Sequence, residues 1–139
     1  MGVGYYILAP AEAERARELA GDRTPTTPLG MRRSIQEWIT SRAAEWHPRD
    51  ADRFTVKIGP EAYFVVALST AESFLRGAPK RSTRDDDVIV EIYLDGRGEG
   101  EADVSLLAEC AKWLGASIFD GQTSEVLSPD AWQKRWNAP

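Results

Sequence analysis

The chain has 139 residues and a formal net charge of −5 at pH 7. This length corresponds to about one ordinary domain, and we expect residues 1–139 to form a single domain. Hydrophobic residues make up 42% and charged residues 28%, which argues against disorder or a coiled coil. The acidic balance argues against nucleic-acid binding as the main function. A single cysteine, Cys110, excludes an intramolecular disulfide.

The first part of the chain is typical of a strand followed by two helices. The apolar run Val3–Leu8 predicts a buried strand. Pro10 suits the first turn of a helix on the surface, which we expect to end near Ala20. In Met31–Trp46, apolar residues recur at helical spacing, which predicts an amphipathic helix with one stripe facing the core. Pro48 is expected to end this helix, because the residue before a proline is pushed away from helical geometry.

The middle of the chain predicts three strands. Phe54–Ile58 alternates apolar and polar residues, as a half-buried strand does. Tyr63–Leu68 is apolar on both faces, as in a covered central strand, and the Gly-Pro turn between the two runs predicts a hairpin. The third strand is Val88–Leu94, after a polar loop. Its alternate residues are expected on one face: Val88, Val90, Ile92 and Leu94.

The last third predicts a helix, a hairpin and a second helix. Asp103 is expected to cap a helix that runs to Leu114. Ser117–Phe119 and Glu125–Leu127 flank an Asp-Gly pair, which favours a hairpin, and Ser128 is placed to cap the final helix. Hairpins thus occur beside helices along the whole chain. This order predicts a single α+β domain, with a mainly antiparallel sheet and helices packed on one face.

The negative charge is concentrated in one third of the chain. The segment from Asp85 to Asp130 contains twelve acidic and two basic residues, whereas residues 1–84 contain thirteen basic and ten acidic residues. We therefore expect an acidic surface built from the second half of the chain. A protein partner with a basic surface would be attracted to it.

No targeting or membrane-spanning segment is predicted. The apolar run at the start has no basic residue before it, and Glu12 and Glu14 follow it closely, unlike a signal peptide. No stretch approaches the ~20 apolar residues that a membrane span needs. We therefore expect a cytoplasmic protein that does not bind membranes.

The segment Leu107–Leu127 combines a helix, a Leu-Gly-Ala sequence, and two short strands around an Asp-Gly turn. It resembles the closing segment of many small bacterial α+β proteins that act as immunity partners of polymorphic toxins. The resemblance covers about a sixth of the chain. It implies a bacterial protein that inhibits a toxin by binding it, and it transfers no binding residue.

No pattern of residues marks a catalytic, metal or cofactor site, and we expect no cofactor. His47, the only histidine, could act as a general base oriented by Asp50 or Asp52, but a place after a helix end explains it as well. Cys110 lies in the middle of a predicted helix near its buried stripe, which favours a structural role. Asp85–Asp87 lacks the spaced oxygen ligands of a calcium loop, and we interpret it as a solvated loop.

Five tryptophans are many for a chain of this length. Trp38 and Trp113 are expected in the core. Trp132 and Trp136 lie four residues apart on the last helix, where they could pack on the sheet or anchor a partner.

The main hypothesis is a non-enzymatic protein-binding domain, most concretely an immunity-type inhibitor of a bacterial toxin. Its expected binding residues are acidic residues in loops or at element ends and two tryptophans: Asp85, Asp86, Asp87, Glu99, Glu101, Asp103, Trp132 and Trp136. One alternative is a small enzyme or a small-molecule-binding protein with a pocket between helix and sheet. Its candidate residues are His47, Tyr63 and Glu91. Another alternative is a structural subunit that docks through its last helix.

Overall fold

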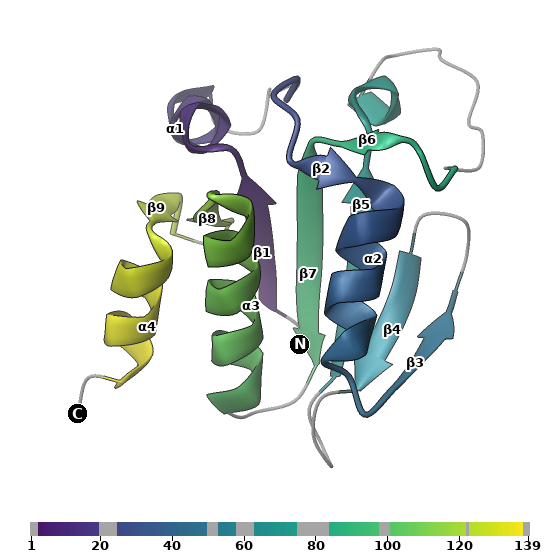
Figure 1. The fold of residues 1–139 in the computed structure, drawn as a ribbon. Helices are drawn as coiled ribbons and strands as arrows, with labels where there is room; N and C mark the ends of the chain where they lie inside the picture. The colour runs from purple at the N-terminus through teal and green to yellow at the C-terminus, as the bar shows by residue number, and fades with distance from the viewer. Residues whose placement is uncertain are drawn as a thin grey trace.

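One antiparallel sheet organises the chain in the computed structural model, which describes residues 3–19, 25–49, 53–57, 63–74, 84–97, 101–121 and 123–137. The described residues form seven strands in the order β3-β4-β5-β7-β1-β8-β9, all antiparallel (Figure 1). A separate two-stranded ribbon pairs β2 (Gly30–Met31) with β6 (Val88–Ile89). The strands of the sheet are β1 (Val3–Leu8), β3 (Glu45–Pro48), β4 (Arg53–Lys57), β5 (Tyr63–Ser69), β7 (Glu91–Arg97), β8 (Ser117–Asp120) and β9 (Glu125–Leu127).

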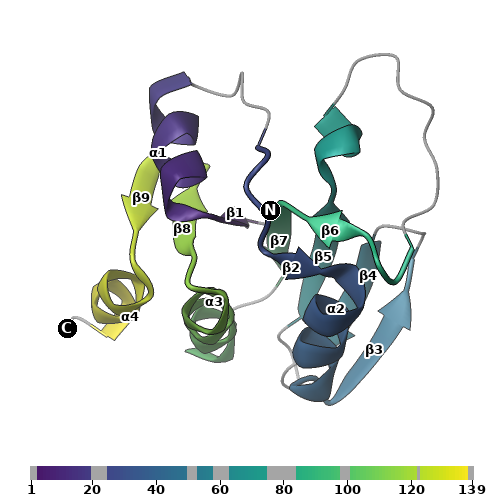
Figure 2. The same ribbon diagram turned by 45° about the horizontal axis from the view of Figure 1, so that its top comes forward.

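The helices lie mainly on one face of this sheet. In the described residues they are α1 (Pro10–Leu19), α2 (Arg32–Ser41), α3 (Glu101–Leu114), α4 (Pro129–Asn137) and one turn of 3₁₀ helix, η1 (Ala71–Phe74). Helices α2, α3 and α4 cover the same face (Figure 1), whereas α1 lies beside β8 and β9 (Figure 2). The predicted α+β fold with a mainly antiparallel sheet is confirmed.

The two predicted hairpins are confirmed as well. Strands β4 and β5 pair antiparallel with Val56 opposite Phe64, and β8 pairs with β9 with Phe119 opposite Val126. The sheet is completed by pairings between distant segments, because β1 at the start of the chain lies between β7 and β8. The N-terminal strand β1 therefore joins the strands β3, β4, β5 and β7 on one side to β8 and β9 on the other.

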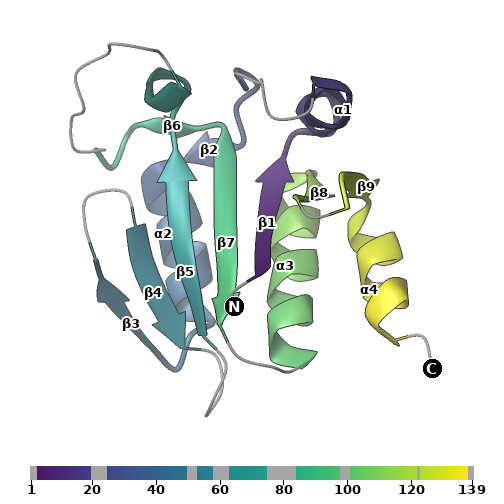
Figure 3. The same ribbon diagram turned by 180° about the vertical axis from the view of Figure 1, so that it is seen from behind.

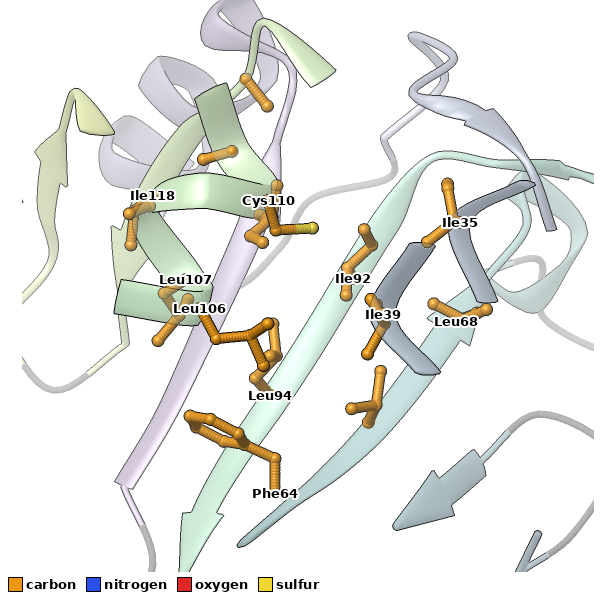
Figure 4. Packing of buried hydrophobic residues seen from close by; sticks show 14 of the residues in the cluster. Ile35, Ile39, Phe64, Leu68, Ile92, Leu94, Leu106, Leu107, Cys110 and Ile118 are labelled. Atoms are coloured by element: carbon orange, nitrogen blue, oxygen red, sulfur yellow. The ribbon is translucent and has the colours of Figure 1, made fainter. Parts of the chain in front are cut away.

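The main core lies between the sheet and the helices α2, α3 and α4. Ile35 and Ile39, one helical turn apart on α2, are buried, and so are Ile92 and Leu94 on β7 (Figure 4). Cys110 of α3 is part of the same cluster. Burying one large aliphatic side chain contributes about 1.5–3 kcal/mol, so this layer supplies much of the stabilisation.

A second, smaller cluster lies on the other face of the sheet. Because side chains alternate along a strand, Ile7 joins the main core while Leu8 points the other way. Leu8 packs there with Phe119 and with Ala13 and Ala16 of α1. Helix α1 therefore covers this face of the sheet near β8 and β9.

The ends of α3 and α4 follow their sequence signals. Gly115 has a φ of 65°, a left-handed conformation that glycine adopts without strain. The N–H of Ala116 then donates to the carbonyl of Ala111 at 2.8 Å, which closes the end of α3. Ser128 caps α4 as predicted, because its Oγ accepts from the N–H of Ala131 at 3.1 Å.

The prediction of one helix over Met31–Trp46 is wrong after Ser41. Helix α2 ends at Ser41, and Trp46 lies in β3, where it pairs with Val56. Pro48 is the last residue of that strand and does not end the helix. The N–H of Ala44 donates to the carbonyl of Lys57 at 2.8 Å, so pairing with β4 takes over where the helix stops.

Three smaller predictions also need correction. Val88 is 46% exposed and does not share the buried face of Ile92, because β6 and β7 are separate strands with a break at Val90. Asp103 lies inside the first turn of α3, which begins at Glu101 and not after Asp103. Trp113 is 46% exposed, although the sequence placed it in the core.

Candidate functional site

The acidic run Asp85–Asp87 forms a tight turn directly before β6. The N–H of Asp87 donates to the carbonyl of Arg84 at 3.0 Å. In return, Oδ2 of Asp87 accepts from the N–H of Arg84 at 2.7 Å. Asp87 thus fixes the turn, whereas Asp85 and Asp86 are exposed.

This turn also closes the beginning of α2. Met31 precedes the helix and provides no side-chain cap. Instead, the carbonyls of Asp87 and Asp85 accept from the N–H groups of Arg32 and Arg33, at 2.8 and 3.1 Å. Nη1 of Arg32 lies 3.5 Å from Oδ1 of Asp85. The free N–H groups of a helix start carry partial positive charge, so the acidic turn is electrostatically suited to this position.

An exposed apolar pair lies beside the acidic turn. Met31 of β2 and Val88 of β6 are directly opposed across the ribbon, and they are 48% and 46% exposed. Opposed residues of antiparallel strands have Cβ atoms about 5 Å apart, so the two side chains form one surface. We call Met31, Val88, Asp85 and Asp86 the ribbon patch.

The structure does not bring the other acidic candidates to this patch. Glu101 and Asp103 lie in the first turn of α3, which follows β7, whereas the acidic turn precedes β6. The seven residues of β7 separate the two groups by roughly 20 Å, and Figure 1 shows β6 and the start of α3 at opposite ends of β7. Glu99 lies outside the described residues.

Of the two tryptophans of α4, Trp132 is placed in the core and not on the surface. Trp132 is 1% exposed, and its ring meets the ring of Tyr5 edge-on at a centroid distance of 4.7 Å. It belongs to the main core, which agrees with the packing interpretation and removes it from the surface. The backbone of Trp136 lies in α4, and its side chain lies outside the described residues.

The three residues of the pocket alternative lie apart. Tyr63 pairs with Arg97, while Glu91 pairs with Ser69 at the other end of the same β5–β7 ladder. His47 is exposed on β3, with its Nε2 4.0 Å from Oε1 of Glu45. Its proposed orienting residues, Asp50 and Asp52, lie outside the described residues. The geometry therefore assembles no shared site from His47, Tyr63 and Glu91.

Cys110 has the properties of a structural cysteine. Its side chain is fully buried in the main core (Figure 4). Burial raises the pKa of its thiol from 9.0 to about 12, and the positive charge of Arg42 opposes this only in part. At neutral pH the side chain is a thiol and not the nucleophilic thiolate.

Two features of the surface were missed by the sequence interpretation. The sequence predicts Met31 at the start of a helix and Val88 on one strand face with Ile92, and neither pattern indicates that Met31 and Val88 are exposed beside the acidic turn. The second feature joins α2 to α3: the rings of Trp38 and Trp113 stack at 5.2 Å with an interplanar angle of 11°. Arg42 lies over the Trp38 ring at 3.6 Å and reaches Glu109 of α3, with Nε 3.7 Å from Oε2.

Comparison of the chain with protein-family models, with curated proteins and with solved structures found no match. Within the described ranges, no three His, Cys, Asp or Glu residues are grouped as a metal site would require. The described helices include none with the length and apolar character needed to cross a bilayer.

Proposed function

We propose that this chain is a non-enzymatic protein-binding domain. In its most concrete form, it is a cytoplasmic immunity protein that inhibits a bacterial toxin by covering its basic surface. The ribbon patch is the observation that carries the proposal. Two apolar side chains and two carboxylates are exposed together at the start of α2.

The composition of the ribbon patch fits a protein partner. Exposed apolar residues bordered by charged ones are a common feature of interaction sites, and methionine is enriched at interfaces. Met31 and Val88 would contact an apolar side chain of the partner. Asp85 and Asp86 would face lysine or arginine residues around it and would accelerate association. The active site of a nuclease toxin is a basic surface of this kind.

The patch is also held in place before binding. The backbone of the acidic turn bonds to Arg32 and Arg33 of α2, and the β2–β6 pairing fixes Met31 opposite Val88. A surface that is already ordered loses little conformational entropy on binding, so more of the contact energy remains as affinity.

The test uses the product of the gene adjacent to the one that encodes this chain. Co-expression should restore growth to cells that produce this product, and the two purified proteins should form a complex. Replacing Asp85→Asn and Asp86→Asn together should slow association by about tenfold and weaken its dependence on salt. The matched control is Glu14→Gln with Glu18→Gln on α1, which removes the same charge and likewise includes one ion-paired carboxylate.

Association that is equally fast in wild type and in the Asp85/Asp86 variant would contradict the role of the ribbon patch. Failure to rescue growth and to form a complex would contradict the immunity function itself.

A further inference from the structure

Strand β3 forms one edge of the seven-stranded sheet, and all four of its residues are exposed. Trp46 is 41% exposed, and its ring touches the buried ring of Phe54 edge-on at a centroid distance of 6.2 Å. An edge strand with an exposed tryptophan is a template for pairing with another strand. The hydrogen-bonding groups and the charged side chains of β3 indicate which strand would pair with it.

The backbone of β3 presents few groups for such pairing. Arg49 and Arg53 are opposed, and the N–H of Arg49 donates to the carbonyl of Arg53 at 3.0 Å. Because hydrogen-bonded pairs alternate in an antiparallel ladder, His47 and Glu45 also direct their backbone groups toward β4. Trp46 and Pro48 therefore direct theirs away from the sheet. Proline has no N–H, so the free edge offers the N–H and carbonyl of Trp46 and the carbonyl of Pro48.

The side chains of β3 divide between the two faces of the sheet. Trp46 lies on the face of Phe54, which α2 covers. Glu45 lies on the opposite face, with Oε1 3.9 Å from Nζ of Lys57 and 4.0 Å from Nε2 of His47. Seen from behind, none of the described helices lies over this face of β3 and β4 (Figure 3).

We propose that β3 pairs antiparallel with β3 of a second copy of this chain, about a two-fold axis through His47. In this register Trp46 lies opposite Pro48 of the second copy. The N–H of each Trp46 then donates to the carbonyl of the opposing Pro48, which pairs two of the three groups that the edge offers, because Pro48 has no N–H for the carbonyl of Trp46. The indole packs against the proline ring on the face of α2.

The same register is complementary in charge. Glu45 comes to lie opposite Arg49 of the second copy, and the symmetry forms this pair twice. Opposed residues that are not hydrogen-bonded have Cα atoms about 4.5 Å apart, so their side chains are close. Within one copy, Arg49 is opposed to Arg53, and like charges in this position are unfavourable. Glu45 of the second copy therefore brings an opposite charge beside Arg49.

A four-residue strand buries little surface, so the dimer belongs with weak assemblies, below ~1,200 Å². It should be measured by sedimentation over a wide range of protein concentration. Wild type should dimerise as concentration rises. Glu45→Arg and Arg49→Glu should each abolish dimerisation, because each brings like charges together. The double variant should restore it, because the pairs are then only inverted.

Glu37→Arg on α2 is the matched control, since it makes the same charge change at an exposed, ion-paired glutamate away from β3. It should leave dimerisation unchanged. Circular dichroism and urea unfolding should show that every variant is folded. A wild type that stays monomeric, or a double variant that does not recover, would overturn the proposal.

Covalent trapping tests the register independently. Opposed residues that are not hydrogen-bonded are close enough for a disulfide, so His47→Cys should form a linked dimer on mild oxidation. Cys110 is buried and should not compete. Trp46→Cys should not cross-link, because residue 46 lies opposite residue 48. Cross-linking of the Trp46 variant in place of the His47 variant would show a different register and overturn the one proposed.

Discussion

At the scale of single residues, burial determines what the side chains of this protein can do. Cys110 is enclosed by the main core, and its thiol holds its proton because a thiolate would lose its hydration there. Trp132 is buried and packs on Tyr5. Both residues could have been functional from their chemistry alone, and both instead stabilise the fold.

The raised pKa of Cys110 predicts a specific dependence of stability on pH. The pKa of this thiol is 9.0 in the unfolded chain and about 12 in the folded protein. The buried, protonated thiol therefore contributes its full share of the free energy of unfolding below pH 9. This contribution is lost as the pH rises from 9 to 12, because the unfolded chain then releases the proton more readily than the folded protein. The difference in free energy of unfolding between wild type and Cys110→Ala should shrink by about 1 kcal/mol from pH 8 to pH 10. A constant difference, measured by urea unfolding at each pH, would show that the thiol is hydrated in the native protein.

At the scale of elements, local sequence predicts the strands better than it predicts the end of α2. Trp46 lies eleven residues after Ile35, in phase with the helical stripe, and no glycine marks an earlier stop. At the end of the helix, the hydroxyl groups of Thr40 and Ser41 donate to carbonyls of the preceding turn, at 2.8 and 2.7 Å. This bonding competes with the helix. Pairing with β4 then outweighs the helical pattern, and such pairing between distant segments is not visible in local periodicity.

Asp85 and Asp86 were predictable as exposed loop residues, but the sequence did not show which residues share their surface. The sequence places Asp85 and Glu101 within seventeen residues of one another, which favoured the idea of a shared patch. The intervening β7 is fully extended and crosses the sheet, so it carries them to opposite ends. Met31 came to the patch through a pairing with Val88 across more than fifty residues, which the sequence does not show.

The acidic turn predicts different effects for neighbouring aspartates. Oδ2 of Asp87 accepts from the N–H of Arg84 at 2.7 Å and holds the turn that closes α2. Asp87→Ala should therefore lower the free energy of unfolding by about 1 kcal/mol. Asp86→Ala removes an exposed carboxylate and should change it by less than about 0.5 kcal/mol. Urea unfolding of both variants separates the structural aspartate from the binding one, and equal losses would show that the turn does not depend on Asp87.

At the scale of the whole molecule, the acidic third of the chain is distributed and not gathered. Its residues extend over β6, β7, α3, β8, β9 and α4. Glu91 and Asp120 are buried, and Glu109 faces Arg42 on α2. The net charge of this segment of the sequence therefore overstates the negative charge at any one place on the surface. Asp85 and Asp86 of the ribbon patch are exposed carboxylates that lie beside exposed apolar residues, Met31 and Val88.

The two large helices of the main layer are joined by aromatic stacking. Helices α2 and α3 lie side by side over different strands (Figure 1), and Trp38 stacks on Trp113 between them. Aromatic pairs contribute about 0.5–1.5 kcal/mol beyond the area that they bury. Because the two helices come from distant parts of the chain, this contact links the first half of the fold to the second.

A double-mutant cycle should measure that link. Trp38→Ala and Trp113→Ala should each lower the free energy of unfolding, and the double variant should lose less than the two single losses added, by about 1 kcal/mol. Trp38→Ala combined with Tyr63→Ala is the control, because Tyr63 lies on the other face of the sheet, next in the strand to the core residue Phe64. Those two losses should add within about 0.5 kcal/mol. Strict additivity for the tryptophan pair would mean that the stack contributes nothing of its own and that the helices are held together by the core beneath them.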